Sequence, residues 1–295
     1  MNQFTIKDIE NLCGIKAHTL RIWEQRYRLC VAKRKESLHR IYDNDDLKEL
    51  LRISFLYHSG HKISRIAELT SEEIDALVQQ ACITPQNYEV FVHQLVEAGV
   101  DFDKEKFEKV INCLLLRIGM EKCITDVFYP FLERIGLLWM TNNVIPAQEH
   151  FASHIIRKKI ILAIDGITES HHQARGNIVV FAPPGEFHEI PLLTANYFFR
   201  KHNHHTTYFG TNVAVESLQY YGQVHAVTAF YAHLITRLDK ERMEIYVQTL
   251  ERDFPGVPIL LSGPASRCIA DSASITKLHS LSELMQYAAE SGAAI

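Results

Sequence analysis

Apolar positions recur with two different periods along this 295-residue chain. Helical spacing dominates as far as about residue 168. From about residue 175, short apolar runs alternate with helical segments. The change of period and the length of the chain, which exceeds that of one typical core, predict a multidomain protein. We expect three domains, over residues 1–80, 81–172 and 173–295.

The first of these domains begins with two short predicted helices, over 5–13 and 16–27, around a tight turn at Gly14. Thr5 is the expected N-cap of the first helix, and Leu20 and Trp23 form the expected buried face of the second. This spacing is typical of a helix-turn-helix, whose second helix enters the DNA major groove. Residues 30–43 then predict a short basic hairpin, a wing over the phosphates.

The second domain has four segments with helical period, at about 85–98, 102–118, 120–139 and 146–168. Their apolar stripes are wide enough for the interior of a four-helix bundle. Pro130 falls within the third segment, so we expect a kink or a break there.

The third domain alternates four predicted strands with four predicted helices. The strands are 177–182, 205–209, 224–230 and 257–262, and the helices are near 187–202, 213–221, 236–252 and 280–290. Such alternation predicts a doubly wound, flavodoxin-like parallel sheet, in which ligands bind beyond the carboxyl ends of the strands. His188 falls in the first of these loops, and "SGPA", from Ser262 to Ala265, falls in the fourth.

Charge changes the picture only near the N-terminus. The net charge is −4, yet residues 16–40 hold eight Lys or Arg against two acids. A solvated helix face would mix the signs, so this surplus favours a polyanion such as DNA. The chain has neither an apolar run of membrane-spanning length nor a signal-peptide layout at its start. We therefore expect a cytoplasmic protein with no membrane partner.

Cysteines and histidines add little that is specific. The six cysteines include no C-x-x-C pair, which argues against a zinc ribbon or a disulfide framework, and we expect them to be reduced. Among the 16 histidines, the clusters at 171–172 and 202–205 could hold a metal only if their side chains converge. We interpret both clusters as exposed connectors.

Three other features have two interpretations each. Imidazole suits a transition metal and an adjacent carboxylate often orients it, so His188 beside Glu186 is a candidate ligand as well as a turn residue. Trp139 near a helix end is ordinarily a core residue. Glu149 and His150 are ordinarily a first helical turn compatible with the helix dipole.

Residues 1–75 resemble the DNA-binding domain of the MerR family of transcription regulators. The motifs that carry this resemblance are "AHTLRIWEQRY", the set Arg34, Arg40 and Tyr42, and "GHKISRIA" at 60–67. The resemblance implies that Lys16, His18 and Arg21 face the groove. It also implies that Tyr27, Arg34, Arg40 and Tyr42 contact the DNA backbone phosphates. Arg28 and Ala32 depart from the usual glycine and proline.

The order of motifs in the rest of the chain resembles the cobalamin-binding module of methionine synthase type. Trp139 is followed after nine residues by Glu149-His150, and an α/β domain with an acid-x-His loop comes next. With the MerR-like domain, the chain is similar to light-responsive, cobalamin-dependent repressors of carotenoid genes.

That resemblance implies a function and a site. His188 would be the lower axial ligand of cobalt in adenosylcobalamin. Trp139, Glu149 and His150 would cap the upper face. The remaining residues that would contact the cofactor are Glu186, Ser262 and Gly263. The partners would be a double-stranded DNA operator and further copies of the chain, as a dimer on DNA and a tetramer in the dark.

Four positions depart from the cobalamin pattern. Glu186 replaces Asp, Pro191 replaces Gly, Phe230 stands near the place of a serine, and Ser262-Gly263 replaces Gly-Gly. We therefore keep an alternative, a MerR-type regulator whose degenerate pocket binds another ligand or a protein partner. An enzyme using cobalamin for methyl transfer or radical chemistry would need a substrate barrel or a partner subunit. We expect a regulator and not an enzyme.

Overall fold

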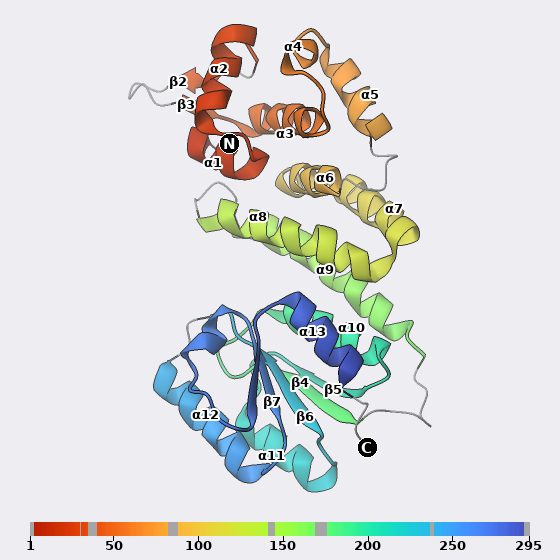
Figure 1. Cartoon of the computed structure of the whole chain (residues 1–295), viewed down its shortest axis with the longest axis vertical. Helices are drawn as coiled ribbons and strands as arrows, with labels where there is room; N and C mark the ends of the chain where they lie inside the picture. The colour runs from red at the N-terminus through yellow and green to blue at the C-terminus, as the bar shows by residue number, and fades with distance from the viewer. Residues whose placement is uncertain are drawn as a thin grey trace. The chain divides into compact units, whose positions relative to one another are not determined.

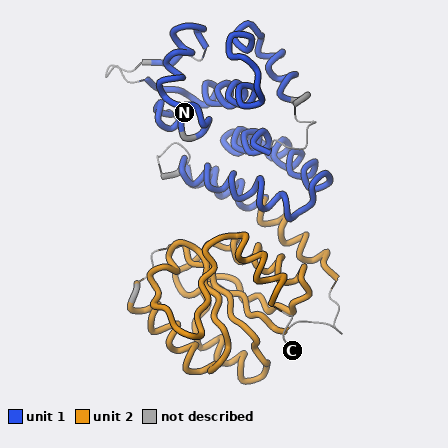
Figure 2. The backbone as a smooth tube through the Cα atoms, in the orientation of Figure 1, with its two compact units in different colours: residues 1–155 blue, residues 156–295 orange. Residues whose placement is uncertain are grey.

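A computed structural model of the protein describes residues 3–29, 31–34, 40–81, 88–140, 145–168, 176–236 and 239–291. The chain forms two compact units, residues 1–155 and 156–295 (Figure 2). This division differs from the three expected domains. The boundary expected at 80/81 lies beside residues 82–87, and that at 172/173 lies within residues 169–175, both outside the described residues.

Unit 1 opens with the expected helix-turn-helix. Strand β1 (Phe4–Thr5) leads into α1 (Ile6–Cys13), and α2 (Ala17–Tyr27) follows. Thr5 and Asp8 form a reciprocal capping box at the start of α1, since each backbone N–H donates to the other side chain. Gly14 ends α1 at φ 68°, in the left-handed region. Leu20 and Trp23 are buried as predicted.

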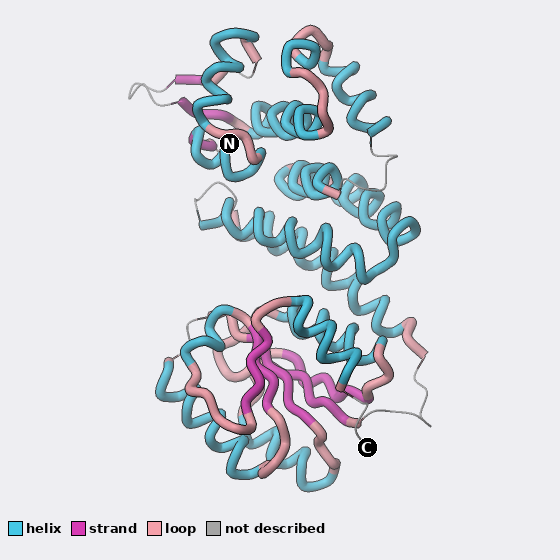
Figure 3. Tube along the Cα trace, in the orientation of Figure 1, coloured by secondary structure: helices cyan, strands magenta, loops and turns pink. Residues whose placement is uncertain are grey.

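A small antiparallel sheet forms the wing. Strands β2 (Lys33–Arg34) and β3 (Arg40–Tyr42) pair, and β1 joins them in the order β1-β3-β2 (Figure 3). Residues 35–39, at the expected tip of the hairpin, lie outside the described residues. The predicted wing is thus confirmed over its two paired strands.

Three further helices complete this part of unit 1: α3 (Asn44–His58), α4 (Ile63–Ile66) and α5 (Ser71–Ala81). Asp43 caps α3, because its carboxylate accepts the N–H groups of Asp45 and Asp46, both at 3.0 Å. Its ion pair with Lys33 and these backbone bonds lower the pKa of Asp43 to about 2.

We expect Asp43→Ala to lower the free energy of unfolding by about 1–2 kcal/mol at neutral pH, because two backbone donors lose their acceptor. Asp43→Asn keeps a capping oxygen and should recover most of that loss. The wild-type advantage is full above the ordinary pKa of 3.8 and declines as pH falls through about 2. Urea titrations of the three proteins between pH 7 and pH 2.5 measure it. An unchanged gap across that range would contradict the pKa assignment.

The predicted bundle helices are α6 (Glu89–Val100), α7 (Lys104–Cys123), α8 (Tyr129–Met140) and α9 (Pro146–Asp165). The break lies at Gly119, with φ 75° and ψ 171°, and a π-helical segment, Ile124–Phe128, follows. Pro130 lies in the first turn of α8, directly after this π-helical segment, so the backbone beside it is irregular but stays helical rather than breaking.

Unit 2 is a parallel sheet with helices on both faces (Figure 1). Its strands are β4 (Asn177–Phe181), β5 (His205–Gly210), β6 (Ala229–His233), β7 (Ile259–Ser262) and β8 (Ile275–Leu278), in the order β5-β4-β6-β7-β8. Its helices are α10 (Glu189–Lys201), α11 (Val215–Val224), α12 (Lys240–Asp253) and α13 (Leu281–Glu290). The strand order is that of flavodoxin-like folds, with the switch point at β4. Strand β8 was not predicted, and β6 begins later than predicted.

Two smaller expectations have mixed outcomes. His204 is buried, with Nε2 2.9 Å from the carbonyl oxygen of Ala288, so the cluster at 202–205 is not simply an exposed connector. Residues 171–172 lie outside the described residues.

Among the described cysteines, Cys13, Cys113, Cys123 and Cys268 are free thiols. Within the described ranges, the helices are too short or too polar to cross a bilayer.

Candidate functional site

One face of α2 carries the residues expected to meet the DNA groove. Lys16, His18 and Arg21 are all exposed, while Leu20 and Trp23 on the opposite face are buried. Lys16 immediately precedes α2, and its Nζ lies 3.0 Å from Glu10 Oε1 with the lysine side chain 72% exposed. The exposed face is therefore polar and basic, as a groove-binding helix requires.

The same face contains three exposed residues that were not predicted: Ile22, Gln25 and Arg26. They follow His18 at four, seven and eight positions, which is the spacing of one helical face. Helical spacing from His18 would have identified all three residues from the sequence. Ile22 is 49% exposed and is apolar on a face that is otherwise polar. Glutamine and apolar side chains are both used to contact base edges in the major groove.

The four residues expected to contact phosphates differ in exposure and in the contacts they make. Tyr42 is corrected: it is only 2% exposed, since strand alternation turns it into the core opposite Phe4 of β1. Arg40 donates from Nε to Glu24 Oε2 at 2.7 Å and so ties the wing to α2. Tyr27 is half-buried. Arg34 lies in β2, but its side chain is outside the described residues.

Arg28, which stands where the family has glycine, adopts the left-handed conformation at φ 54° and ends α2. A side chain is strained there, whereas glycine is not. We expect Arg28→Gly to raise the free energy of unfolding by about 0.5–1 kcal/mol, as measured by thermal and urea denaturation. Arg28→Ala, which keeps a Cβ, is the control and should show no gain. A loss of stability in Arg28→Gly would mean that the arginine side chain itself stabilises the turn.

At the carboxyl edge of the sheet in unit 2, Glu186 joins two loops. Its side chain is fully buried. Oε2 accepts the backbone N–H groups of Ile235 and Thr236, both at 2.7 Å, while Oε1 accepts those of Phe187 and His188. Burial raises the pKa of Glu186, but the bonds from His188 and from the backbone outweigh it and lower the pKa to about 2. Glu186 is therefore a fixed anion.

His188 is oriented by this anion. Its Nδ1 lies 2.5 Å from Glu186 Oε1, and the residue is the N-cap of α10 with a half-exposed side chain. A carboxylate bound to one ring nitrogen fixes the tautomer that presents the other nitrogen to a metal. The donor set thus fits a cobalt ion bound through Nε2 of a neutral imidazole.

A second polar group lies at the ends of β6 and β7. Ser262 Oγ is 2.7 Å from the Tyr231 hydroxyl and 2.8 Å from His233 Nδ1. Burial lowers the pKa of His233 to about 4, so it is neutral at physiological pH. Gly263, at φ 85°, passes so close to β6 that an added Cβ would lie 2.4 Å from the Leu234 carbonyl oxygen.

Two of the positions that depart from the cobalamin pattern, Pro191 and Phe230, have ordinary structural places in this fold. Pro191 lies in the first turn of α10, where a backbone N–H has no helical acceptor to lose. Phe230 is fully buried in β6 between Val179 and Ile259, and it does not reach the loop edge. The residue of β6 that lies at the loop edge is His233, the last residue of the strand.

The expected upper-face residues belong to unit 1. Glu149 and His150 lie in the first turn of α9, with Glu149 Oε2 2.8 Å from His150 Nδ1 and the histidine 76% exposed. Trp139 lies in α8, but its side chain is outside the described residues. The structure thus brings together Glu186 and His188, places Ser262 and Gly263 on the adjoining strand end, and pairs Glu149 with His150.

Comparison with known families matches two separate parts of the chain. Residues 4–73 match the model described as a MerR HTH family regulatory protein, and residues 92–163 match a B12 binding domain. The chain thus carries a MerR-type helix-turn-helix domain and a B12-binding domain. The matched residues cover the helix-turn-helix and most of the bundle.

Two proteins similar to this chain are transcriptional repressors. The chain is 24% identical over 273 residues to the HTH-type transcriptional repressor CarH of Myxococcus xanthus, covering 90% of each chain. It is 22% identical to the repressor CarA of that organism, over 72% of this chain and 70% of CarA. Among solved structures, the Methanosarcina barkeri monomethylamine corrinoid protein matches 69% of this chain and 99% of its own with a TM-score of 0.56, at 12% identity. That likeness concerns the fold.

Proposed function

We propose that this regulator is a repressor that senses adenosylcobalamin, and through it light, with cobalt held by His188. The observation that carries the proposal is the hydrogen bond between Glu186 Oε1 and His188 Nδ1 at the carboxyl edge of the sheet. When bound, the cofactor supplies a cobalt–carbon bond that visible light breaks. Trp139, Glu149 and His150 would cover the face that carries the adenosyl group.

The proposed partner is a double-stranded operator in the cytoplasm. Two copies of α2 in a dimer would occupy half-sites about one helical turn apart. A cofactor that drives assembly to a tetramer must bind the assembled state more tightly than the free one. The proposed role is regulatory and not catalytic, which the two related repressors support.

The test is the visible absorption spectrum of the purified protein after mixing with adenosylcobalamin in the dark and gel filtration. We expect a co-eluting, histidine-ligated spectrum that changes under green light. His188→Ala should lose that spectrum yet remain folded, because the His188 side chain is half-exposed and Glu186 keeps its four backbone donors without it. A spectrum unchanged in His188→Ala would exclude the proposed ligand.

A second candidate is a sensor of another small ligand or a protein partner. The observation that favours it is Ser262, whose hydroxyl fills a position where the cobalamin pattern has glycine and already bonds Tyr231 and His233. Absence of co-eluting colour with the wild-type protein would support this candidate and leave the DNA-binding role in place.

The exposed Ile22 makes a separate prediction about DNA. We expect it to contact a thymine methyl group in the major groove, which contributes about 1 kcal/mol. Replacing that thymine by uracil in one half-site, which removes one methyl, should weaken wild-type binding about fivefold and leave Ile22→Ala unaffected. Fluorescence anisotropy on an operator selected from random duplexes measures both. Equal losses in the two proteins at every thymine would contradict the contact.

A further inference from the structure

Helix α6 lies between α3 and the bundle helices α7 and α8 within unit 1 (Figure 1). It packs against α3 on one side and against α7 and α8 on the other. Nearly the whole helix is buried from Val90 to Val100, polar residues included. A buried helix with charged side chains is held in place by specific partners, and those partners identify what α6 connects.

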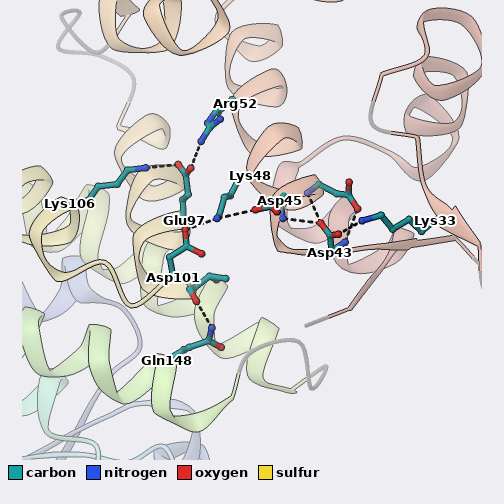
Figure 4. A network of polar contacts seen from close by, with 11 residues as sticks. Lys33, Asp43, Asp45, Lys48, Arg52, Glu97, Asp101, Lys106 and Gln148 are labelled. Atoms are coloured by element: carbon teal, nitrogen blue, oxygen red, sulfur yellow. Dashed lines mark hydrogen bonds and ion pairs between the residues drawn. The ribbon is translucent and has the colours of Figure 1, made fainter. Parts of the chain in front are cut away.

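Glu97 is the central contact of α6. Its side chain is only 9% exposed, and it pairs with Arg52 of α3 and with Lys106 of α7, whose Nζ is 3.0 Å from Oε2 (Figure 4). Arg52 Nε also lies 3.2 Å from Asp75 of α5. A carboxylate this buried is costly without cationic partners, so these contacts favour one arrangement of α3, α6 and α7.

Two more contacts fix α3 on α6. Lys48 Nζ lies 2.6 Å from Asp101 at the end of α6, and His93 Nδ1 lies 3.2 Å from the Leu51 carbonyl oxygen. Helix α3 is in direct contact with the recognition helix. The Tyr57 ring of α3 lies edge-on to Trp23 of α2, with centroids 5.0 Å apart.

The same C-terminal end of α6, which holds Glu97 and Asp101, also contacts the first turn of α9. Gln148, only 4% exposed, donates its side-chain amide to the carbonyl oxygen of Val100, in the last turn of α6. Its Oε1 accepts the backbone N–H of Ile145 at 3.0 Å. Glu149 and His150, the expected cofactor residues, come directly after Gln148. One side chain therefore joins the expected cofactor turn to α6.

We propose that α6 couples cofactor occupancy to the DNA-binding helices, with Gln148 and Glu97 as its two positioning residues. Cofactor bound against Glu149 and His150 fixes the first turn of α9. Gln148 transmits that position to the end of α6, and Glu97 with Asp101 transmits it to α3 and so to α2. This inference rests on the proposed function, because it requires a cofactor at Glu149 and His150.

The test compares operator affinity with and without adenosylcobalamin in the dark, in wild type, Gln148→Met and Glu97→Gln. Wild type should show a ratio of the size usual for allosteric coupling, about 5- to 150-fold. Both variants should reduce the ratio to about one while binding cofactor, followed by absorbance, within about twofold of wild type. Gln286→Met, at an exposed glutamine of α13, is the matched control and should keep the wild-type ratio.

A wild-type ratio retained in both variants would overturn the inference and leave the proposed function standing. A wild-type protein that binds cofactor without any change in operator affinity would overturn both. Hydrogen exchange on the unmodified protein gives a readout that does not depend on the variants folding. Cofactor should slow amide exchange in α6 and α3, and slowing confined to α9 would overturn the proposed path.

Discussion

Glu186→Ala is expected to lower the free energy of unfolding of unit 2 by about 3–5 kcal/mol, among the largest effects of any single substitution here. The carboxylate accepts four backbone N–H groups from two loops in addition to His188 Nδ1. Removing it leaves those donors without their acceptor and unlinks the two loops. Urea denaturation followed by circular dichroism measures the change.

Glu186→Gln separates the structural role from ligand orientation. The amide keeps one acceptor oxygen and the shape of the side chain, so it should recover part of the stability. It removes the anion that orients His188, which we expect to weaken cobalamin binding about 10- to 100-fold. Glu251→Gln is the control, because Glu251 is a half-buried acid of α12 that accepts from the hydroxyl groups of Ser272 and Ser274. Wild-type stability in Glu186→Ala would refute the role of Glu186 as the anchor of both loops.

Gly263→Ala is expected to be almost as damaging, by about 3–5 kcal/mol. Two costs combine: the backbone is left-handed at φ 85°, and the new Cβ would meet the Leu234 carbonyl oxygen at 2.4 Å. Gly256→Ala isolates the first cost, because Gly256 has φ 81° with nothing within 4 Å of an added Cβ. That control should lose only about 1–2 kcal/mol.

The same denaturation series decides the interpretation. Equal losses for Gly263→Ala and Gly256→Ala would mean that the loop after β7 yields to a methyl group. The close approach to β6 would then be unimportant for stability.

Local patterns in the sequence predicted most of the elements. The Thr5 cap, the Gly14 turn and the buried Leu20 and Trp23 follow from short-range rules, and all are confirmed. The doubly wound parallel sheet follows from the alternation of strands and helices, and it is confirmed. Strand β8 was missed because it is a short edge strand whose exposed and half-buried positions include Lys277.

The contacts that assemble the site were harder to predict. The pairing of Glu186 with His188 is local, and sequence spacing found it. Its bonds to Ile235 and Thr236, and the ion pair of Glu97 with Arg52, join residues far apart in the chain, for which one sequence carries no signal. Tyr42 shows the reverse error, in which a motif position was interpreted as functional although strand alternation buries it.

The boundary between the two units, at residues 155 and 156, falls inside the single helix α9. Ile155 and Ile156 on either side of it are both buried, so a cut there would expose apolar surface on each fragment. A chimaeric regulator that exchanges only the sheet domain would have to splice a helix in phase and keep its 3.6-residue repeat. Exchange of the sheet domain for another is therefore simpler if α9 is inherited whole, from Pro146 onward, together with the sheet that follows it.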